Sequence, residues 1–176
     1  MKTNLFVSIF IAGAIICSCN SRSDNKTDNS SENFILQQPD GTLTLRLEKA
    51  VYYNNDDDPS GNTAEWNVTI TKTGRYNVWL SSATRDTTDL NYTKDIKVNL
   101  QDSPLEASKE INRIVRNSNE VLHPYYQADS FMGSFFVQEP GEYYVQVISE
   151  KIVSEENGKE SDNIRLMSVL LTPQTR

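Results

Sequence analysis

The stretch that decides the fold is AEWNVTITKTGRYNVWLS, residues 64–81. Apolar residues occupy every second position on both sides of the turn sequence Lys72-Thr73-Gly74. A period of two among β-branched and aromatic residues is typical of a strand with one buried face. Gly74 suits the turn because glycine tolerates a positive φ. The stretch therefore predicts a β-hairpin whose inward residues run from Trp66 to Leu80.

A second stretch, residues 135–147, repeats this pattern near the C-terminus. Glu139-Pro140-Gly141 takes the place of Lys72-Thr73-Gly74, and a Gly-x-Tyr-x-Val segment follows in both copies. Two matching hairpins predict either two sheets of one sandwich or two equivalent strand pairs of one barrel.

Shorter segments also alternate, at residues 42–48 and 95–100, and residues 164–172 are apolar on both faces, as in a central strand. Residues 103–126 have no clear period, so we expect a long ordered excursion there. Seven to nine strands, no long helix and no β-α-β alternation predict an all-β fold. The expected architecture is an antiparallel β-sandwich or jelly roll, with an up-and-down barrel as the alternative.

The first residues differ in composition from the rest. Residues 5–16 form an apolar run behind a short basic segment. This run is too short to span a membrane and is typical of a secretory signal. Residues 20–33 contain no apolar side chain and predict a flexible tether, with a root-mean-square reach of roughly 20 Å.

The sequence Ile16-Cys17-Ser18-Cys19 resembles the lipobox of bacterial lipoproteins. The resemblance implies cleavage before Cys19, acylation of Cys19 and, because Asn20 follows it, anchoring to the outer membrane. A secretory signal ending near Ser18 is the alternative. The expected organisation is a signal peptide at 1–18, a lipidated cysteine and tether at 19–33, and a β-sandwich domain at 34–176. No cysteine would then remain for a disulfide or for thiol chemistry.

The net charge and the histidine content disfavour two classes of function, nucleic-acid binding and catalysis. The formal net charge is −7 and no run of basic residues occurs, which disfavours nucleic-acid binding. The single histidine, His123, lies next to a proline and no nucleophile motif accompanies it. Triad and metal-dependent hydrolysis normally need more than that, so we expect a domain without catalysis.

The acidic loop at residues 54–62, NNDDDPSGN, contains two candidate calcium ligands, Asp56 and Asp58. Carboxylate and amide oxygens are the ligands that calcium prefers. The loop lacks the ligand spacing of an EF-hand, so a solvated acidic loop is the competing interpretation. No other cofactor is expected.

The aromatic residues predict where a ligand could bind. If Tyr76 points inward, Trp79 points to the opposite face beside Asn77. An aromatic plane next to an amide suits a sugar ring, which stacks its C–H face and hydrogen-bonds through its hydroxyls. In the alternative interpretation, residues 103–126 cover Trp79. Further candidates lie in and beside predicted loops, where recognition residues are frequent: Tyr92, Tyr125, Tyr126, Gln127 and Asp129.

Three parts of the chain resemble carbohydrate-binding modules of family 6 and the β-sandwich domains appended to fucosidases and other glycoside hydrolases. They are LRLEKAVYY at 45–53, the stretch at 64–83, and residues 134–150 with 163–173. The resemblance implies a galactose-binding-like jelly roll that recognises glycans. It also implies a structural calcium site. Glu48 fits one ligand of that site, but Arg165 stands where an acidic ligand is expected.

We therefore expect a membrane-anchored, non-catalytic lipoprotein that binds glycans by aromatic stacking. The alternative is an envelope protein-interaction or assembly subunit without sugar binding. The expected partners are the bilayer through Cys19, a glycan, and an envelope protein in the alternative.

Overall fold

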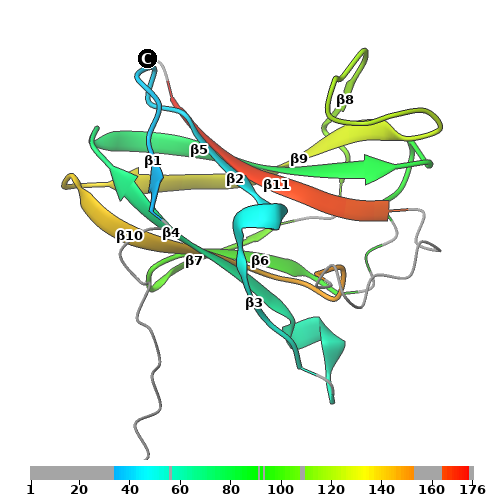
Figure 1. Ribbon diagram of the computed structural model, residues 1–176, viewed down its shortest axis with the longest axis horizontal. Helices are drawn as coiled ribbons and strands as arrows, with labels where there is room; N and C mark the ends of the chain where they lie inside the picture. The colour runs from blue at the N-terminus through cyan, green and yellow to red at the C-terminus, as the bar shows by residue number, and fades with distance from the viewer. Residues whose placement is uncertain are drawn as a thin grey trace, which may run out of the picture. The chain divides into compact units, whose positions relative to one another are not determined.

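The computed structural model describes residues 34–55, 57–90, 92, 94–107, 110–152 and 164–174. The predicted signal peptide and tether, residues 1–33, lie outside the described residues, and so does Asp56. The described part contains eleven strands and two short 3-10 helices, η1 (Leu47–Lys49) and η2 (Pro59–Gly61) (Figure 1). Among these residues no helix is long and apolar enough to cross a membrane.

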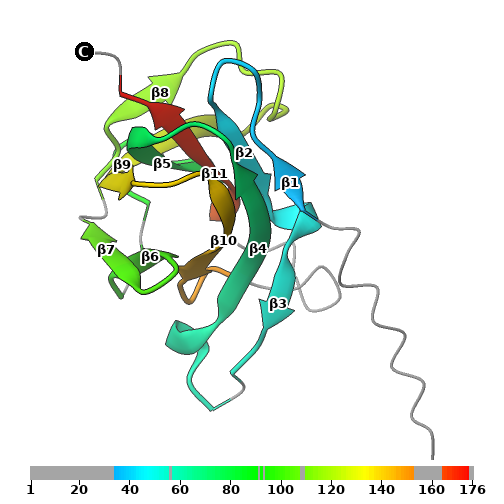
Figure 2. The ribbon, with the colours of Figure 1, turned by 90° about the vertical axis from the view of Figure 1, so that its left-hand side faces the viewer.

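Six strands form the first sheet. Its order is β1-β4-β10-β6-β7, with β3 also paired to β4. These strands are β1 (Ile35–Leu36), β3 (Val51–Tyr53), β4 (Thr63–Ile70), β6 (Ile96–Leu100), β7 (Ser103–Ala107) and β10 (Gly141–Ile148). β1 is parallel to β4 and the other pairs are antiparallel. β1 and β3 lie one after the other along the same edge of β4 (Figure 2).

Five antiparallel strands form the second sheet, in the order β2-β11-β5-β9-β8. They are β2 (Leu43–Arg46), β5 (Gly74–Thr84), β8 (Arg113–Val115), β9 (Tyr126–Val137) and β11 (Ile164–Pro173). Two separate sheets confirm the predicted β-sandwich and exclude the barrel. The expected number of strands was too low. The 103–126 excursion contributes β7 to one sheet and β8 to the other, and two further short strands, β1 and β3, pair with the edge of β4.

The two predicted hairpins are wrong in their pairing. β4 and β5 belong to different sheets, and so do β9 and β10. Instead, each strand pairs with its counterpart from the other copy, β4 with β10 and β5 with β9. Each turn therefore carries the chain from one sheet to the other. A period of two describes a buried face equally well in a hairpin and in such an arch, so alternation could not distinguish them.

The repeated Gly-x-Tyr signature has a local cause in these arches. The Tyr76 hydroxyl donates to the Lys72 carbonyl oxygen at 2.6 Å, and the Tyr143 hydroxyl donates to the Glu139 carbonyl oxygen at 2.6 Å. In both copies the tyrosine closes the turn onto a carbonyl four residues earlier. Gly74 has a φ of 138°, in the region that favours glycine.

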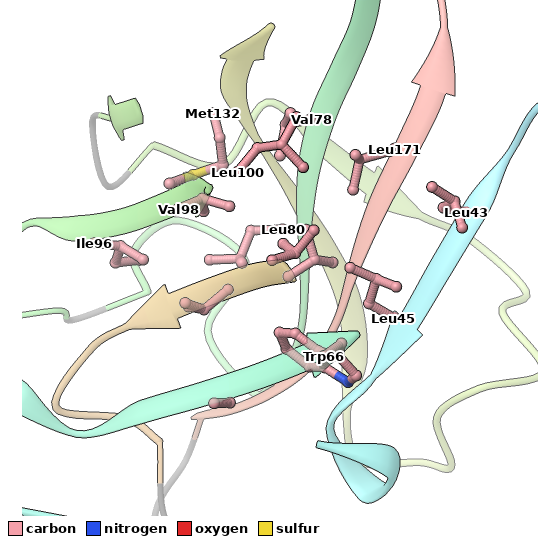
Figure 3. Packing of buried hydrophobic residues seen from close by; sticks show 14 of the residues in the cluster. Leu43, Leu45, Trp66, Val78, Leu80, Ile96, Val98, Leu100, Met132 and Leu171 are labelled. Atoms are coloured by element: carbon pink, nitrogen blue, oxygen red, sulfur yellow. The ribbon is translucent and has the colours of Figure 1, made fainter. Parts of the chain in front are cut away.

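The predicted inward residues form the core between the sheets (Figure 3). The alternating apolar residues of β4 and β5 are at most 2% exposed: Trp66, Val68, Ile70, Tyr76, Val78 and Leu80. Trp66 also links the two sheets, because its indole Nε1 donates to the Arg46 carbonyl oxygen of β2 at 2.8 Å. The buried indole N–H is thus satisfied. Burial of this continuous cluster fixes which face of each sheet remains outside.

Candidate functional site

An aromatic pair lies on the outer face of the five-stranded sheet. The β5–β9 register places Gly133 opposite Val78 and Phe131 opposite Trp79, with a shift between these pairs. The extra residue, Met132, turns into the core and is 3% exposed. This β-bulge brings Phe131 beside Trp79, with ring centroids 5.0 Å apart and planes inclined by 52°. Trp79 is half-buried and Phe131 is 39% exposed.

A cation lies over the same indole ring. Arg113 extends from the edge strand β8, and its Cζ is 5.2 Å from the Trp79 ring centroid. Its Nε donates to Asp129 Oδ2 at 3.0 Å, and its Nη2 donates to the same oxygen. The Arg113 side chain is 54% exposed, whereas that of Asp129 is 2% exposed. The remaining guanidinium N–H groups can therefore reach a ligand while the carboxylate beneath them cannot.

Asp129 is the centre of a buried polar cluster. Its Oδ1 accepts hydrogen bonds from the Ser81 hydroxyl and, at 3.1 Å, from Gln127 Nε2. Gln127 Nε2 also lies 3.1 Å from Ser81 Oγ, and the Ser118 hydroxyl donates to Gln127 Oε1. Both carboxylate oxygens are thus occupied. A buried charge is tolerable in this setting because it is paired and hydrogen-bonded.

The excursion covers only part of the outer face. Glu120, in the segment between β8 and β9, forms an ion pair with Arg46 of β2, at the opposite edge of the sheet. Ser81 and Ala83, on the same face as Trp79, are each only 4% exposed. The face is thus buried at residues 81–83 and half-open at Trp79, so the excursion does not cover the indole completely.

Asn77, Gln127 and Asp129 share the outer face with Trp79, in agreement with their strand positions. Asn77 and Gln127 are half-buried. Asp129 is 1% exposed, so its predicted direct contact with a ligand is wrong, and its contacts instead position Arg113.

Tyr92 is not a surface residue, which contradicts the prediction. It is 5% exposed and belongs to the core, with its hydroxyl 3.3 Å from Ser82 Oγ. Burial raises the pKa of its phenol to about 12. Tyr92 was expected in or beside a loop, but it turns inward together with Leu90, which is fully buried.

Tyr125 and Tyr126 do not join Trp79 in one site. Tyr126 is 46% exposed and opposes Thr84, on the alternate face of β5 from Trp79. Thr84 lies five positions along β5 from Trp79, about 17 Å away. Tyr125 lies under Arg85, whose Cζ is 4.8 Å from its ring centroid.

The calcium candidates are not assembled into a site in the described residues. Glu48 is exposed in η1, and Asp58 caps η2 by accepting from the Ser60 backbone N–H at 3.1 Å and hydroxyl at 2.6 Å. These bonds hold the pKa of Asp58 below its usual value. Across the described ranges, no group of three or more His, Cys, Asp or Glu could hold a metal ion.

The paired groups Arg113 and Asp129 should respond unequally to mutation. Arg113→Ala leaves the buried carboxylate without its cation and should destabilise the fold by about 3 kcal/mol. Asp129→Asn removes the charge but keeps an acceptor, and should cost about 1–2 kcal/mol. Urea unfolding of both variants measures the difference. Equal losses, or a larger loss for Asp129→Asn, would contradict the assignment of a buried, charge-dependent cluster.

Comparison with known proteins shows that this chain is similar in fold to part of a solved structure. No protein-family profile and no curated protein sequence matches the chain. The alpha-L-fucosidase from Vibrio sp. strain EJY3 is similar in structure over 80% of this chain, with a TM-score of 0.61 and 19% identity.

Two other solved structures are more distant. They are the Podospora anserina GH26-CBM35 beta-(1,4)-mannanase, at 13% identity over 78% of this chain and 28% of the mannanase (TM-score 0.45), and CBM35 from Cellvibrio japonicus Abf62, at 11% identity over 76% of this chain and 94% of that module (TM-score 0.37). This chain spans 24% of the fucosidase. The chain thus shares its sandwich fold with a portion of that larger protein.

Proposed function

We propose that this chain is a lipid-anchored, non-catalytic protein of the bacterial cell envelope that binds glycans on the outer face of its five-stranded sheet. The observation that carries the proposal is the half-open Trp79 ring, with Phe131 tilted against it and the Arg113 guanidinium over part of it. Two aromatic planes and a set of hydrogen-bond donors on one rigid sheet are the chemistry that a sugar ring requires.

Binding would follow from the geometry of these groups. The C–H face of a sugar stacks on the exposed part of Trp79 and Phe131. Hydroxyl groups accept from the Arg113 N–H groups that Asp129 does not use, and they bond to the Asn77 amide. Because Asp129 already fixes Arg113, little side-chain order has to be gained on binding.

The absence of catalysis is part of the proposal. Acid–base catalysis requires a carboxyl group that can exchange a proton with the substrate. The buried carboxylate on this face, Asp129, has both oxygens bonded to protein donors and is only 1% exposed. This arrangement supports binding rather than turnover. A sugar ligand also accords with the similar fold in an alpha-L-fucosidase.

The proposed lipid anchor is supported by the sequence. The apolar run at residues 5–16, followed by Ile16-Cys17-Ser18-Cys19, supports acylation of Cys19, and Asn20 supports retention at the outer membrane.

A protein partner is the second candidate function, and one surface favours it. Leu36, Val51 and Tyr53 are 70%, 51% and 53% exposed. The register places them opposite Thr69, Glu65 and Thr63, so they follow one edge of β4 on its outward side. An exposed apolar column of this kind is a feature of protein interfaces.

Trp79→Ala should weaken glycan binding by at least about tenfold, because it removes the central stacking surface. A glycan array with the full-length protein identifies a ligand, and titration calorimetry measures the loss. Tyr53→Ala, an exposed tyrosine on the other sheet, is the matched control and should bind normally. Phe131→Ala, at a more exposed position, should also weaken binding. It provides the test if Trp79→Ala disturbs the fold. Unchanged affinity in folded Trp79→Ala and Phe131→Ala variants would refute the site.

Cys19→Ala should abolish labelling by palmitate and release the protein from the membrane fraction, because Cys19 is the proposed acylation site. Cys17→Ala is the matched control and should remain labelled and membrane-bound. Labelling that persists in Cys19→Ala would place the anchor elsewhere.

A further inference from the structure

The fold separates charge between its two sheets. All six arginines within the described residues belong to strands of the five-stranded sheet or directly follow one: Arg46, Arg75, Arg85, Arg113, Arg116 and Arg165. They come from β2, β5, β8 and β11, so residues far apart in the sequence gather on one sheet. The chain as a whole carries a net charge of −7.

The register directs four of these arginines to the outer face. Residues that are directly opposite on neighbouring strands point to the same side of a sheet. Arg113 opposes Asp129, which opposes Ser81, and Arg165 opposes Ala83. Arg46 lies opposite Ser168, and Ser168 lies opposite Ser81 on its other side. Arg75 lies four residues before Trp79 on β5, so both side chains point to the same face. The four arginines therefore share the outer face with Ser81, Ala83 and Trp79.

Not all of this charge is neutralised. Arg113 and Arg46 are paired with Asp129 and Glu120. Arg75 donates to the Ser134 hydroxyl at 3.1 Å. Neither Arg75 nor the exposed Arg116 and Arg165 forms an ion pair with a carboxylate in the part of the chain that the structure describes. Arg85 contributes less, because Asp86 follows it directly and Asp89 lies four residues after it.

The other outer face has the opposite character. Glu65, Glu142 and Glu106 lie on the outward side of the six-stranded sheet, opposite Gln146, Thr69 and Lys97. Gln146 Nε2 donates to Glu65 Oε2 at 2.6 Å, and Lys97 pairs with Glu106 at 2.9 Å. Asp102 adds a further carboxylate, 3.4 Å from the Tyr144 hydroxyl. The two faces of one sandwich therefore differ in sign.

We propose that the ligand of the Trp79 face is an anionic polysaccharide, one that carries carboxylate or sulfate groups. This inference rests on the proposed glycan binding and names the class of glycan. Guanidinium groups bind carboxylate and sulfate through paired N–H donors, and the aromatic pair binds the sugar rings between the charged groups. The opposite, acidic face repels the same ligand and so restricts it to one side.

The spacing of the arginines suits an extended chain of sugars. Arg75 and Arg165 lie at the levels of residues 75 and 83 of β5, each four residues from Trp79. At the rise of a β-strand each is about 13 Å from the indole, on opposite sides of it. A single sugar ring cannot contact both Arg75 and Trp79, whereas a polysaccharide lying along this half of β5 can. Arg165 lies beyond the covered residues 81–83, so it attracts the charged chain from outside this uncovered path.

The experiment compares two pairs of glycans that share a backbone and differ in whether it carries charged groups. Polygalacturonate is compared with its methyl ester, and dextran sulfate with dextran, by titration of the full-length protein in detergent. The charged member of at least one pair should bind about tenfold tighter than its neutral partner. Raising the salt concentration should remove most of this advantage, because exposed charge pairs are screened.

Charge-removing variants locate the effect. Arg75→Gln and Arg165→Gln should each reduce the preference for the charged glycan. Lys97→Gln removes the same charge from the acidic face and is the matched control, with binding unchanged. Circular dichroism confirms that the variants are folded.

Each outcome bears on a different part of the inference. Equal binding of charged and neutral glycans, still dependent on Trp79, would overturn the anionic ligand and leave the proposed function intact. No binding of any glycan would overturn both. Tighter binding of double-stranded DNA than of either charged glycan would identify a nucleic-acid surface and would overturn the proposal.

Discussion

The candidate site depends on one buried carboxylate. Asp129 lies beneath the outer surface of the five-stranded sheet, and burial without partners would be too costly for a charged group. Its partners come from three strands, since Ser81 belongs to β5, Gln127 to β9 and Arg113 to β8. Gln127 extends the cluster to Ser118 in the segment that covers residues 81–83. Satisfying one charge therefore fixes both the cover and the cation beside Trp79.

The same cluster explains why the face is divided. Where donors converge on Asp129, the sheet is covered and Ser81 and Ala83 are buried. One step further along β5, the bulge at Met132 turns Phe131 outward and Trp79 stays half-open. The structure thus places a rigid support next to an accessible aromatic surface. Preorganisation of this kind lowers the entropy lost when a ligand binds.

Alternation in the sequence correctly predicted a β-sandwich and the inward residues of β4 and β5, because burial of one strand face depends on a local period of two. It did not predict which strands pair. Tyr76 and Tyr143 were read as parts of hairpins, yet their hydroxyl bonds close turns that cross between sheets. Strand pairing is a long-range property, and the local pattern of an arch is the same as that of a hairpin.

The site was predictable only in part, for similar reasons. Trp79 and Asn77 follow from strand alternation. Arg113 has no local signal, since its position depends on β8 pairing with β9. Phe131 is displaced by a β-bulge. A glycine inside a strand can indicate a bulge, and Gly133, which has a φ of 114° in the structure, lies two residues after Phe131. The arginine-rich face could not be predicted from the sequence, because its arginines are dispersed from residue 46 to residue 165.

Mapping the bound ligand by backbone amide chemical shifts tests the central claim most directly, namely that the ligand lies on the outer face of the five-stranded sheet. On addition of a charged glycan, the amides of residues 77–81, 113–115 and 127–131 should shift, while those of residues 65–67 and 144–146 on the other sheet should not. Shifts concentrated on the six-stranded sheet, or along its β1–β3 edge, would contradict the account.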